Sequence, residues 1–169
     1  SAAVLWGEGP DFCAGADLSY MRGRSSLELR EYLSLFPKMS ASMAAMRKPT
    51  IAAVNGLALA GGTGITMACD LAVSTDQARF GVTETNVGLW PMTIQATMAR
   101  SLGRKRLLYL LMTGDTIDAW EAERIGMINK VVPDDKLEEA WMELATKLAG
   151  KSPTSMKIGK DSYYAMEDM

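Results

Sequence analysis

One stretch of the chain, residues 49–70, constrains the fold more than any other part of the sequence. It begins with a proline and a short apolar run, Ile51 to Val54, whose β-branched members predict a buried strand. Asn55-Gly56 is a strong turn pair, and Gly61-Gly62 precedes an apolar helical segment that can begin at Thr63. The stretch therefore predicts a strand, a turn, a glycine corner and a helix in close succession.

A glycine corner at the start of a helix has no Cβ atoms. A ligand can therefore approach backbone N–H groups that the helix itself leaves without acceptors. Those donors lie at the positive end of the helix dipole, where they suit an oxygen atom that gains negative charge during a reaction. The alternative interpretation is that the glycines only form a tight turn and let the helix pack closely. This stretch by itself supports the second interpretation at least as well as the first.

Composition and charge exclude several other classes of protein. The 169 residues are 48% hydrophobic, without a repeat or linker, and predict a single domain over 1–169 with a substantial core. No apolar run approaches the length of a membrane span, so we expect no membrane partner. A net charge of −2 without a basic cluster argues against nucleic acid as a partner. The first residues predict a strand that is already under way, which indicates a fragment of a longer chain.

The chain contains no histidine. This excludes Ser-His-Asp and Cys-His catalysis, histidine general bases and histidine-ligated metals, and we expect no metal site. Cys13 and Cys69 lie far apart in apolar surroundings, which predicts buried free thiols and a reducing compartment such as the cytoplasm. No complete dinucleotide fingerprint, phosphate-binding loop or Cys-x-x-Cys pair is present. Acid–base chemistry must therefore come from carboxylates, Lys, Tyr or Cys.

Besides the glycine corner, a loop of small residues follows a predicted strand at 3–6. It is the run Phe12 to Leu18, in which small residues surround Gly15. Small side chains leave the backbone accessible, so this loop is a candidate second source of N–H donors. The more common structure for such a run is a packed crossing in which Asp17 caps a helix.

Helical spacing recurs along the rest of the chain. Residues 25–46 predict a helix that opens with a capping box of Ser25 and Glu28 and that Pro37 kinks or divides. Further helices are predicted at 94–102, at 104–113, between Asp118 and Gly126, from Asp134 or Asp135, and from Ser152-Pro153 to Met166, with short strands at 71–74 and 127–132.

Glu84 is the only carboxylate in the segment 82–92, where it lies among threonine and apolar residues. An apolar setting disfavours the charged form of a carboxyl group, and the resulting higher pKa suits proton transfer. The alternative is a solvent-facing glutamate on a loop, which these residues alone favour.

Three segments then occur in a characteristic order and spacing. They are Phe12 to Leu18; residues 48–56 with Ala60-Gly61-Gly62 and Cys69-Asp70; and Phe80 to Glu84 with Val87-Gly88. Together they resemble the enoyl-CoA hydratase/isomerase (crotonase) superfamily. The resemblance continues through Thr113-Gly114-Asp115, 119–122, 126–128 and Val131-Val132-Pro133, over nearly the whole chain.

The resemblance implies an α/β fold, a spiral of ββα units. It also implies an acyl-CoA substrate whose thioester oxygen lies between the backbone N–H groups of Ala16 and Gly61, with Glu84 transferring the proton. Coenzyme A is then part of the substrate, and no separate cofactor is expected. By the same resemblance, substrate-binding contacts fall to Ala14, Ala16, Asp17, Leu18, Gly62, Thr83 and Trp90.

The chain departs from the two-glutamate hydratases of this family at Gly64, where those hydratases carry their first glutamate, and again at Leu89 to Met92. One carboxylate suffices to move a proton between two carbons, because the same group can take the proton and return it. Three functions therefore stay open. They are water addition to a 2-enoyl-CoA, Δ3-Δ2-enoyl-CoA isomerisation with the single glutamate, and an impaired subunit that only binds acyl-CoA or assembles with others.

Relative to the family, an N-terminal strand region and a C-terminal helical segment are missing from this sequence, which again indicates a fragment. The resemblance implies a homo-oligomer, a trimer or a dimer of trimers. The length of the acyl chain is not specified by the sequence.

Overall fold

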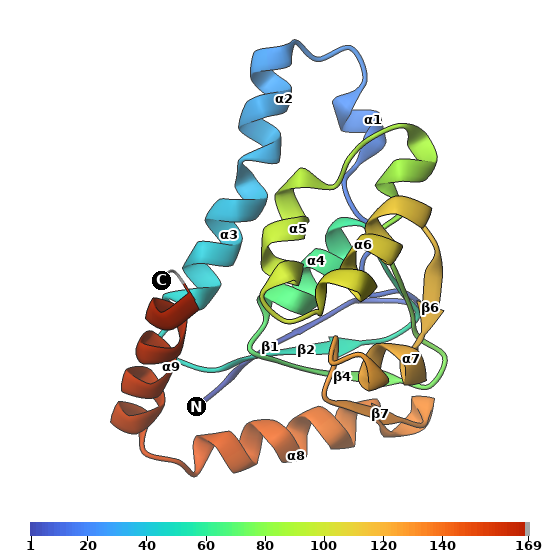
Figure 1. Ribbon diagram of the computed structural model, residues 1–169. Helices are drawn as coiled ribbons and strands as arrows, with labels where there is room; N and C mark the ends of the chain where they lie inside the picture. Colours follow the sequence, from blue (N-terminus) through green and yellow to red (C-terminus); the bar gives the residue numbers. More distant parts are fainter. Residues whose placement is uncertain (168–169) are drawn as a thin grey trace.

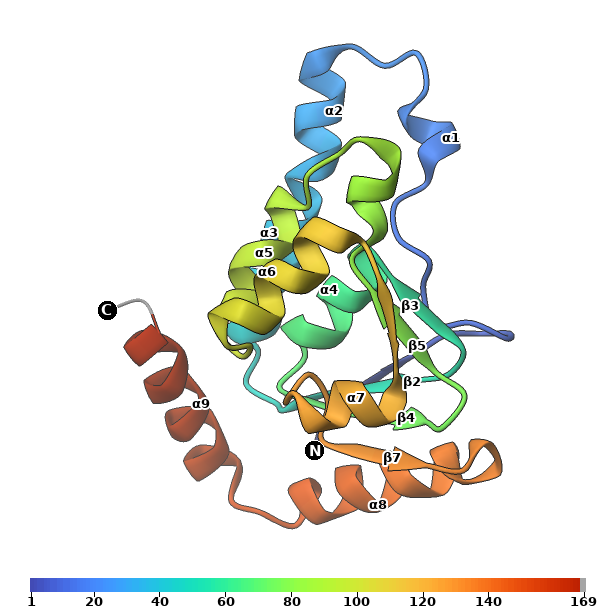
Figure 2. The same cartoon turned by 45° about the vertical axis from the view of Figure 1, so that its right-hand side comes forward.

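The computed structural model describes residues 1–167, which form two β-sheets surrounded by helices (Figure 1). The first sheet is parallel throughout and has the strand order β1-β2-β4-β7. In the second sheet, visible in Figure 2, β5 pairs parallel with β3 and antiparallel with β6. The strands are β1 (Ala3–Trp6), β2 (Thr50–Val54), β3 (Leu57–Leu59), β4 (Leu71–Thr75), β5 (Arg79–Gly81), β6 (Thr116–Asp118) and β7 (Lys130–Val132).

Helices and 3-10 turns connect and cover these strands. They are α1 (Leu18–Met21), α2 (Ser26–Leu33), α3 (Leu35–Ala44), α4 (Gly61–Ala68), η1 (Thr83–Val87), α5 (Met92–Ala99), α6 (Arg104–Thr113), α7 (Ala119–Arg124), η2 (Asp134–Lys136), α8 (Leu137–Ala149) and α9 (Pro153–Glu167). Among them, α2 extends beyond the body of the molecule, and α3 packs against α4 and α5 (Figure 1).

The predicted spiral of ββα units is confirmed. One turn runs β2-β3-α4 and the next runs β4-β5-η1-α5. In each turn the first strand joins the four-stranded sheet and the second joins the three-stranded sheet, so that Ile51 pairs with Leu71 and Leu57 with Arg79. Each turn thus spans both sheets before its helix begins.

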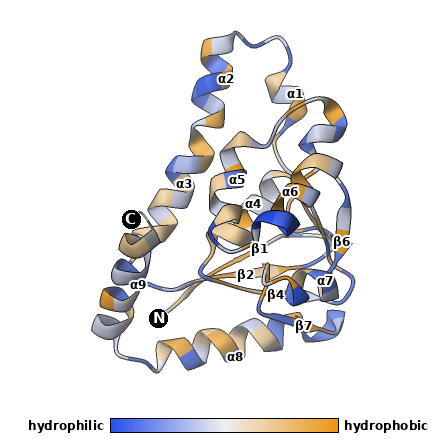
Figure 3. Ribbon diagram, viewed as in Figure 1, coloured by the Kyte–Doolittle hydropathy of each residue, from blue (hydrophilic) through white to orange (hydrophobic). Residues whose placement is uncertain are grey.

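The central strand β2 is buried along its whole length. Helix α8 contacts one side of the four-stranded sheet, and α4 lies on the other side (Figure 1). A parallel strand covered on both faces needs an almost continuous apolar sequence, and Ala52 and Ala53 are small enough to let both layers approach closely. Figure 3 shows the contrast between this apolar centre and the strongly hydrophilic residues of α2.

The boundaries of several elements differ from those predicted. The predicted helix over 25–46 divides at Ser34, upstream of Pro37, because a proline ring clashes with the carbonyl group four residues earlier. The predicted capping box of Ser25 and Glu28 is present. Helix α4 begins at Gly61 rather than Thr63, and α8 begins after the 3-10 turn η2. The two cysteines are free thiols as predicted, but Cys13 is only half-buried.

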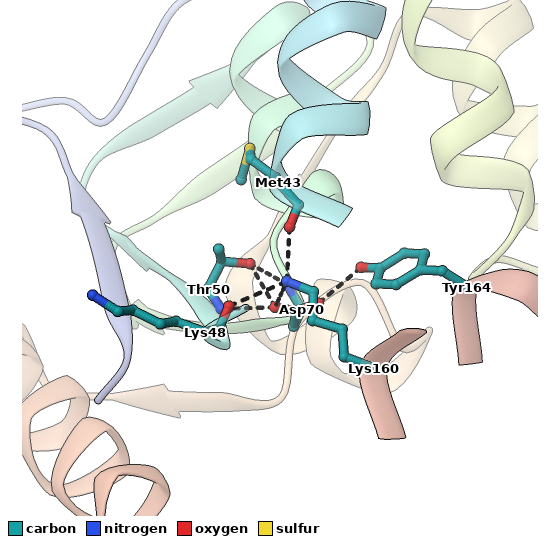
Figure 4. A network of polar contacts seen from close by, with 6 residues as sticks. All are labelled: Met43, Lys48, Thr50, Asp70, Lys160 and Tyr164. Atoms are coloured by element: carbon teal, nitrogen blue, oxygen red, sulfur yellow. Dashed lines mark hydrogen bonds and ion pairs between the residues drawn. The ribbon is translucent and has the colours of Figure 1, made fainter. Parts of the chain in front are cut away.

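A polar network fastens α9 to the body of the protein (Figure 4). Lys160 donates to the carbonyl group of Met43 at 2.7 Å and to Asp70 Oδ2 at 2.7 Å. Asp70 also accepts hydrogen bonds from the amide and hydroxyl groups of Thr50 and from the hydroxyl group of Tyr164. Because the network links α3, β2 and α9, it fixes α9 to the rest of the protein.

Within residues 1–167, none of the helices combines the length and the apolar character that crossing a lipid bilayer requires.

Candidate active site

The candidate site is built on the corner where β3 turns into α4. Ala60 has the positive φ angle of 50°, a conformation that costs a residue with a side chain about 1–3 kcal/mol. Its amide donates to the carbonyl group of Gly81 at 2.8 Å, which ties the corner to the end of β5. The side chain of Ala60 cannot cap the helix. Helix α4 therefore starts with backbone N–H groups that no side chain at its N-cap satisfies.

The buried hydroxyl group of Thr63 connects this corner to the neighbouring strands by hydrogen bonds. Thr63 Oγ1 lies 2.6 Å from the carbonyl oxygen of Ala58 and 2.9 Å from that of Gly81, and it accepts a hydrogen bond from the amide of Gly81 at 3.1 Å. One side chain thus joins β3, α4 and β5. The sequence marked Thr63 only as a helix start, and its place directly after two glycines was the one available signal of this role.

The small-residue loop lies against the same corner. Its backbone is fixed to β3, since the amide of Cys13 donates to Leu57 and the carbonyl group of Cys13 accepts from Leu59, both at 2.9 Å. A Cβ atom on Gly62 would lie 2.0 Å from that carbonyl oxygen of Cys13. The close crossing of loop and helix therefore requires glycine at position 62.

The structure brings the backbones of Ala16 and Gly61 side by side. A Cβ atom built on Gly61 would lie 3.9 Å from the amide nitrogen of Ala16 and 3.6 Å from the Cα atom of Gly15. Gly15 has a φ angle of 107°, and a side chain there would meet the Cβ atom of Ala60 at 2.8 Å. Among residues 1–167, no protein acceptor takes a hydrogen bond from the amide of Ala16 or of Gly61. Two amide groups without a protein acceptor in that range thus lie close together.

Glu84 lies in η1, three residues after the strand end that accepts the amide of Ala60. Its side chain is half-buried, and its Oε2 atom has no hydrogen-bond partner among residues 1–167. Burial raises the pKa of this carboxyl group above its usual value of 4.5. A half-buried carboxyl group with one oxygen left without a partner and with a raised pKa is a candidate acid–base group.

The other predicted binding residues have more varied positions. The Asp17 carboxylate caps α1 by accepting from the amides of Ser19 and Tyr20. The hydrogen bond from the Ser19 hydroxyl lowers the pKa of this carboxyl group most, and the two amide bonds lower it further. The alternative of a helix cap at this position is therefore confirmed. Trp90 is 43% exposed, and its indole nitrogen donates to Gln95 at 2.8 Å. Ala14, Ala16, Asp17 and Leu18 are exposed, Thr83 is half-buried and Gly62 is buried.

A cavity of about 750 Å³ lies away from the paired amides, at the C-terminal end of α4. It is bounded by residues of α3, α4, α5 and α9, including Ala41, Met67, Thr97 and Gly159. Because α4 has eight residues, its two ends are separated by roughly 12 Å. The cavity therefore adjoins the Lys160 network, and the paired amides lie at the opposite end of the helix.

Comparison with known proteins shows the family to which the chain belongs. Residues 1–168 match the family model described as enoyl-CoA hydratase/isomerase, and the chain belongs to that family. A putative enoyl-CoA hydratase of Thermus thermophilus is 37% identical over 172 residues, which cover 99% of this chain and 68% of that protein. The short-chain-enoyl-CoA hydratase of Clostridium acetobutylicum is 37% identical over 163 residues, which cover 95% of this chain and 62% of that protein.

Solved structures agree with this assignment. An enoyl-CoA hydratase of Mycobacterium smegmatis superposes with a TM-score of 0.95 at 34% identity, over 99% of this chain and 66% of that one. Human enoyl-CoA hydratase domain-containing protein 3 gives a TM-score of 0.91 at 35% identity, over 96% of this chain and 64% of that one. The chain spans 68% of the length of the Thermus thermophilus protein and 54% of that of rat enoyl-CoA hydratase domain-containing protein 3.

Proposed function

We propose that the protein is an acyl-CoA enzyme of the hydratase/isomerase type, which stabilises a thioester enolate with the backbone amides of Ala16 and Gly61. The observation that carries the proposal is the pair of amides itself. Both lack protein acceptors within residues 1–167, they come from distant segments, and they meet at the N-terminus of a helix. Coenzyme A enters only as part of the substrate, and no further cofactor is required.

The chemistry explains why two such donors are useful. Removing a proton from the carbon beside a thioester, or adding a nucleophile to its conjugated double bond, moves negative charge onto the thioester oxygen. Fixed N–H donors stabilise that charge without having to reorganise during the reaction. Loss of one such donor typically costs about 2.7–4 kcal/mol of transition-state stabilisation.

Glu84 is assigned the proton transfer. Its half-buried position and the Oε2 atom without a partner among residues 1–167 support this role, because a pKa raised above that of an ordinary carboxyl group makes Glu84 a better proton acceptor. The loop residues Ala14, Asp17 and Leu18 are assigned contacts with the coenzyme A moiety, and their exposure is compatible with such contacts. Gly62, Thr83 and Trp90 are the remaining assigned substrate contacts.

Two reactions fit this assignment. Water addition to a 2-enoyl-CoA is the reaction that the names of the hydratase relatives suggest. The alternative is migration of a double bond from the 3- to the 2-position of an enoyl-CoA, which the buried Gly64 favours because it provides no second carboxylate. A third function, acyl-CoA binding without turnover, remains the non-enzymatic alternative.

A steady-state assay with 2-enoyl- and 3-enoyl-CoA substrates tests the proposal. Glu84→Gln should lower kcat by about 10²- to 10⁴-fold and leave acyl-CoA binding, measured by calorimetry, largely intact. Glu143→Gln is the matched control, because Glu143 is exposed on the distant helix α8. Full activity of Glu84→Gln would remove Glu84 from this role. Binding without turnover of any enoyl-CoA would instead favour the non-enzymatic alternative.

We also propose that the chain acts as a homo-oligomer, a trimer or a dimer of trimers, in a reducing compartment such as the cytoplasm. Exposed apolar side chains such as Leu27, Leu35 and Met92 support association, since such groups are often covered in assemblies. The two free thiols suit a reducing environment. Sedimentation measurements on the protein would test the oligomeric state, and a monomer at all concentrations would contradict it.

A further inference from the structure

The 3-10 turn η1, which carries Glu84, has few hydrogen bonds to the rest of the protein. Its backbone bonds are local, since the amide of Leu89 donates to the carbonyl group of Glu84 at 3.0 Å and that of Gly88 donates to Thr85 at 3.1 Å. No side chain caps its N-terminus. Among residues 1–167, the one side-chain hydrogen bond that joins η1 to another element is made by Asn86.

Asn86 lies against the end of α6. Its side-chain nitrogen donates to the carbonyl group of Gly114 at 3.1 Å, and this bond is partly buried. Gly114 is itself buried and ends α6 in the left-handed conformation, with a φ angle of 67°. A Cβ atom on Gly114 would lie 2.5 Å from Oδ1 and 2.9 Å from Cγ of Asn86. The amide group of Asn86 therefore fills the space that any side chain at position 114 would need.

The chain segment 114–116 also supports the corner that carries the paired amides. Thr116 begins β6 and pairs with Gly81, the last residue of β5. A Cβ atom on Gly81 would lie 2.9 Å from Cγ2 of Thr116, so the two strands are in close contact here. The carbonyl group of Gly81 accepts the amide of Ala60 at 2.8 Å. One segment thus contacts both the support of the amide corner and the turn η1.

We propose that Asn86 is a positioning residue for Glu84. Its hydrogen bond to Gly114 fixes η1 to the segment that supports the amide corner, and this sets the position of the carboxyl group relative to the paired amides. A misplacement of about 1 Å in an active site can cost about 10²-fold in rate. The inference rests on the proposed function and adds to it a residue that acts through Glu84.

A first experiment removes the hydrogen bond and keeps the bulk of the side chain. Asn86→Leu is assayed in the full chain with 2-enoyl-CoA and 3-enoyl-CoA as separate substrates. On the substrate that the unchanged protein turns over, kcat should fall at least about tenfold while KM stays within about twofold. The reason is that the bound substrate loses an aligned base and keeps its binding contacts.

Gln77→Leu is the matched control for this substitution. The Gln77 side chain is exposed, and within residues 1–167 its amide group donates only to the neighbouring Asp76. It should leave both kcat and KM unchanged. A rise in KM with unchanged kcat in Asn86→Leu would contradict a positioning role.

A second experiment tests whether Asn86 acts through Glu84. In the Glu84→Gln background no base is left to position, so Asn86→Leu should cause no further loss of the residual kcat. A general structural role would instead lower kcat by the same factor in both backgrounds, because the effects of independent sites add in free energy.

A third experiment displaces Asn86 without replacing it. Gly114→Ala places a Cβ atom against Asn86 and should lower kcat at least about tenfold. Gly126 also has a positive φ angle, 82°, but a Cβ atom there meets nothing within 4 Å. Gly126→Ala imposes a similar backbone strain and should leave kcat unchanged. In the Asn86→Ala background, where the contact is absent, Gly114→Ala should add less than about a twofold loss.

The outcomes separate the inference from the proposed function. Unchanged kcat in Asn86→Leu, an equal factor of loss in the Glu84→Gln background, or equal losses in Gly114→Ala and Gly126→Ala would overturn the role of Asn86 and leave the enolate chemistry standing. Unchanged turnover in Glu84→Gln, or turnover of neither substrate by the unchanged protein, overturns both.

Discussion

The side-chain nitrogen of Lys160 lies 2.7 Å from Oδ2 of Asp70, across a sequence separation of 90 residues. Only 8% of the Lys160 side chain and 18% of the Asp70 side chain are exposed. Removing one partner leaves the other charge poorly solvated, so Lys160→Met should lower the free energy of unfolding by about 3 kcal/mol. Denaturant titration measures this change.

The control for this prediction lies one turn away on the same helix. Lys157 forms an ion pair with Asp161, but both side chains are more than a third exposed. Lys157→Met should therefore change the free energy of unfolding by less than about 1 kcal/mol. Equal losses for Lys157→Met and Lys160→Met would contradict a special role for the buried pair.

Thr63→Val should destabilise the fold by about 1–3 kcal/mol, because it keeps the shape of the side chain and removes the hydroxyl group that joins β3, α4 and β5. Thr66→Val is the matched control on the same helix, since within residues 1–167 the Thr66 hydroxyl bonds only to the carbonyl group of Gly62 one turn earlier. It should cost about 0.5–1.5 kcal/mol. Thermal unfolding measures the loss of stability in both variants. A larger loss for Thr66→Val than for Thr63→Val would refute the prediction.

Gly15→Ala should impair the site by moving the amide of Ala16 away from Gly61, because its Cβ atom would meet that of Ala60. We expect kcat/KM for an enoyl-CoA to fall by about 10²-fold, the smallest effect typical of losing one oxyanion donor. Gly9→Ala imposes a similar backbone strain, with a φ angle of 99°, but meets nothing within 4 Å. Gly9→Ala should therefore leave kcat/KM unchanged, and an equal loss in both variants would assign the effect to backbone strain.

The pH dependence should follow Glu84. Burial raises the pKa of this carboxyl group above 4.5, so activity that needs the carboxylate should fall as pH decreases through that raised value. Since the folded state favours the protonated form, this contribution to stability is fully present below pH 4.5 and is lost as pH rises through the folded pKa. Glu84→Gln should therefore have the higher Tm at about pH 7, and the difference should vanish in acid. A Tm difference that does not vary with pH would contradict this assignment.

Local chemistry made much of the fold predictable. The turn at Asn55-Gly56, the capping box at Ser25 and the end of α6 before Gly114 all depend on neighbours in sequence, and all three appear as predicted. The strands β3, β5 and β6 were not predicted as strands. Each has three residues, too few to show an alternating pattern, and each exists because of its pairing with the others.

The candidate site was predictable to a similar extent. Glycine and small residues marked both backbone segments, but only the resemblance singled out Ala16 and Gly61 as a pair. The packing of Phe36 and Ile94 against Gly64 had no sequence signal, because an apolar residue at helical spacing looks the same whether it fills the general core or closes one position above Gly64. Such contacts depend on how three helices converge, which spacing along one helix does not specify.

Helix α4 starts without a side-chain cap, and this has an evolutionary consequence. Serine or aspartate at position 60, with the backbone changed to the extended conformation usual for an N-cap, would offer the first turn its own acceptor and stabilise the helix. The same acceptor would compete with an incoming carbonyl group for the free amides. Selection for durability and selection for catalysis therefore act in opposite directions on this residue, and thermostable variants obtained by random screening should be checked for changes here first.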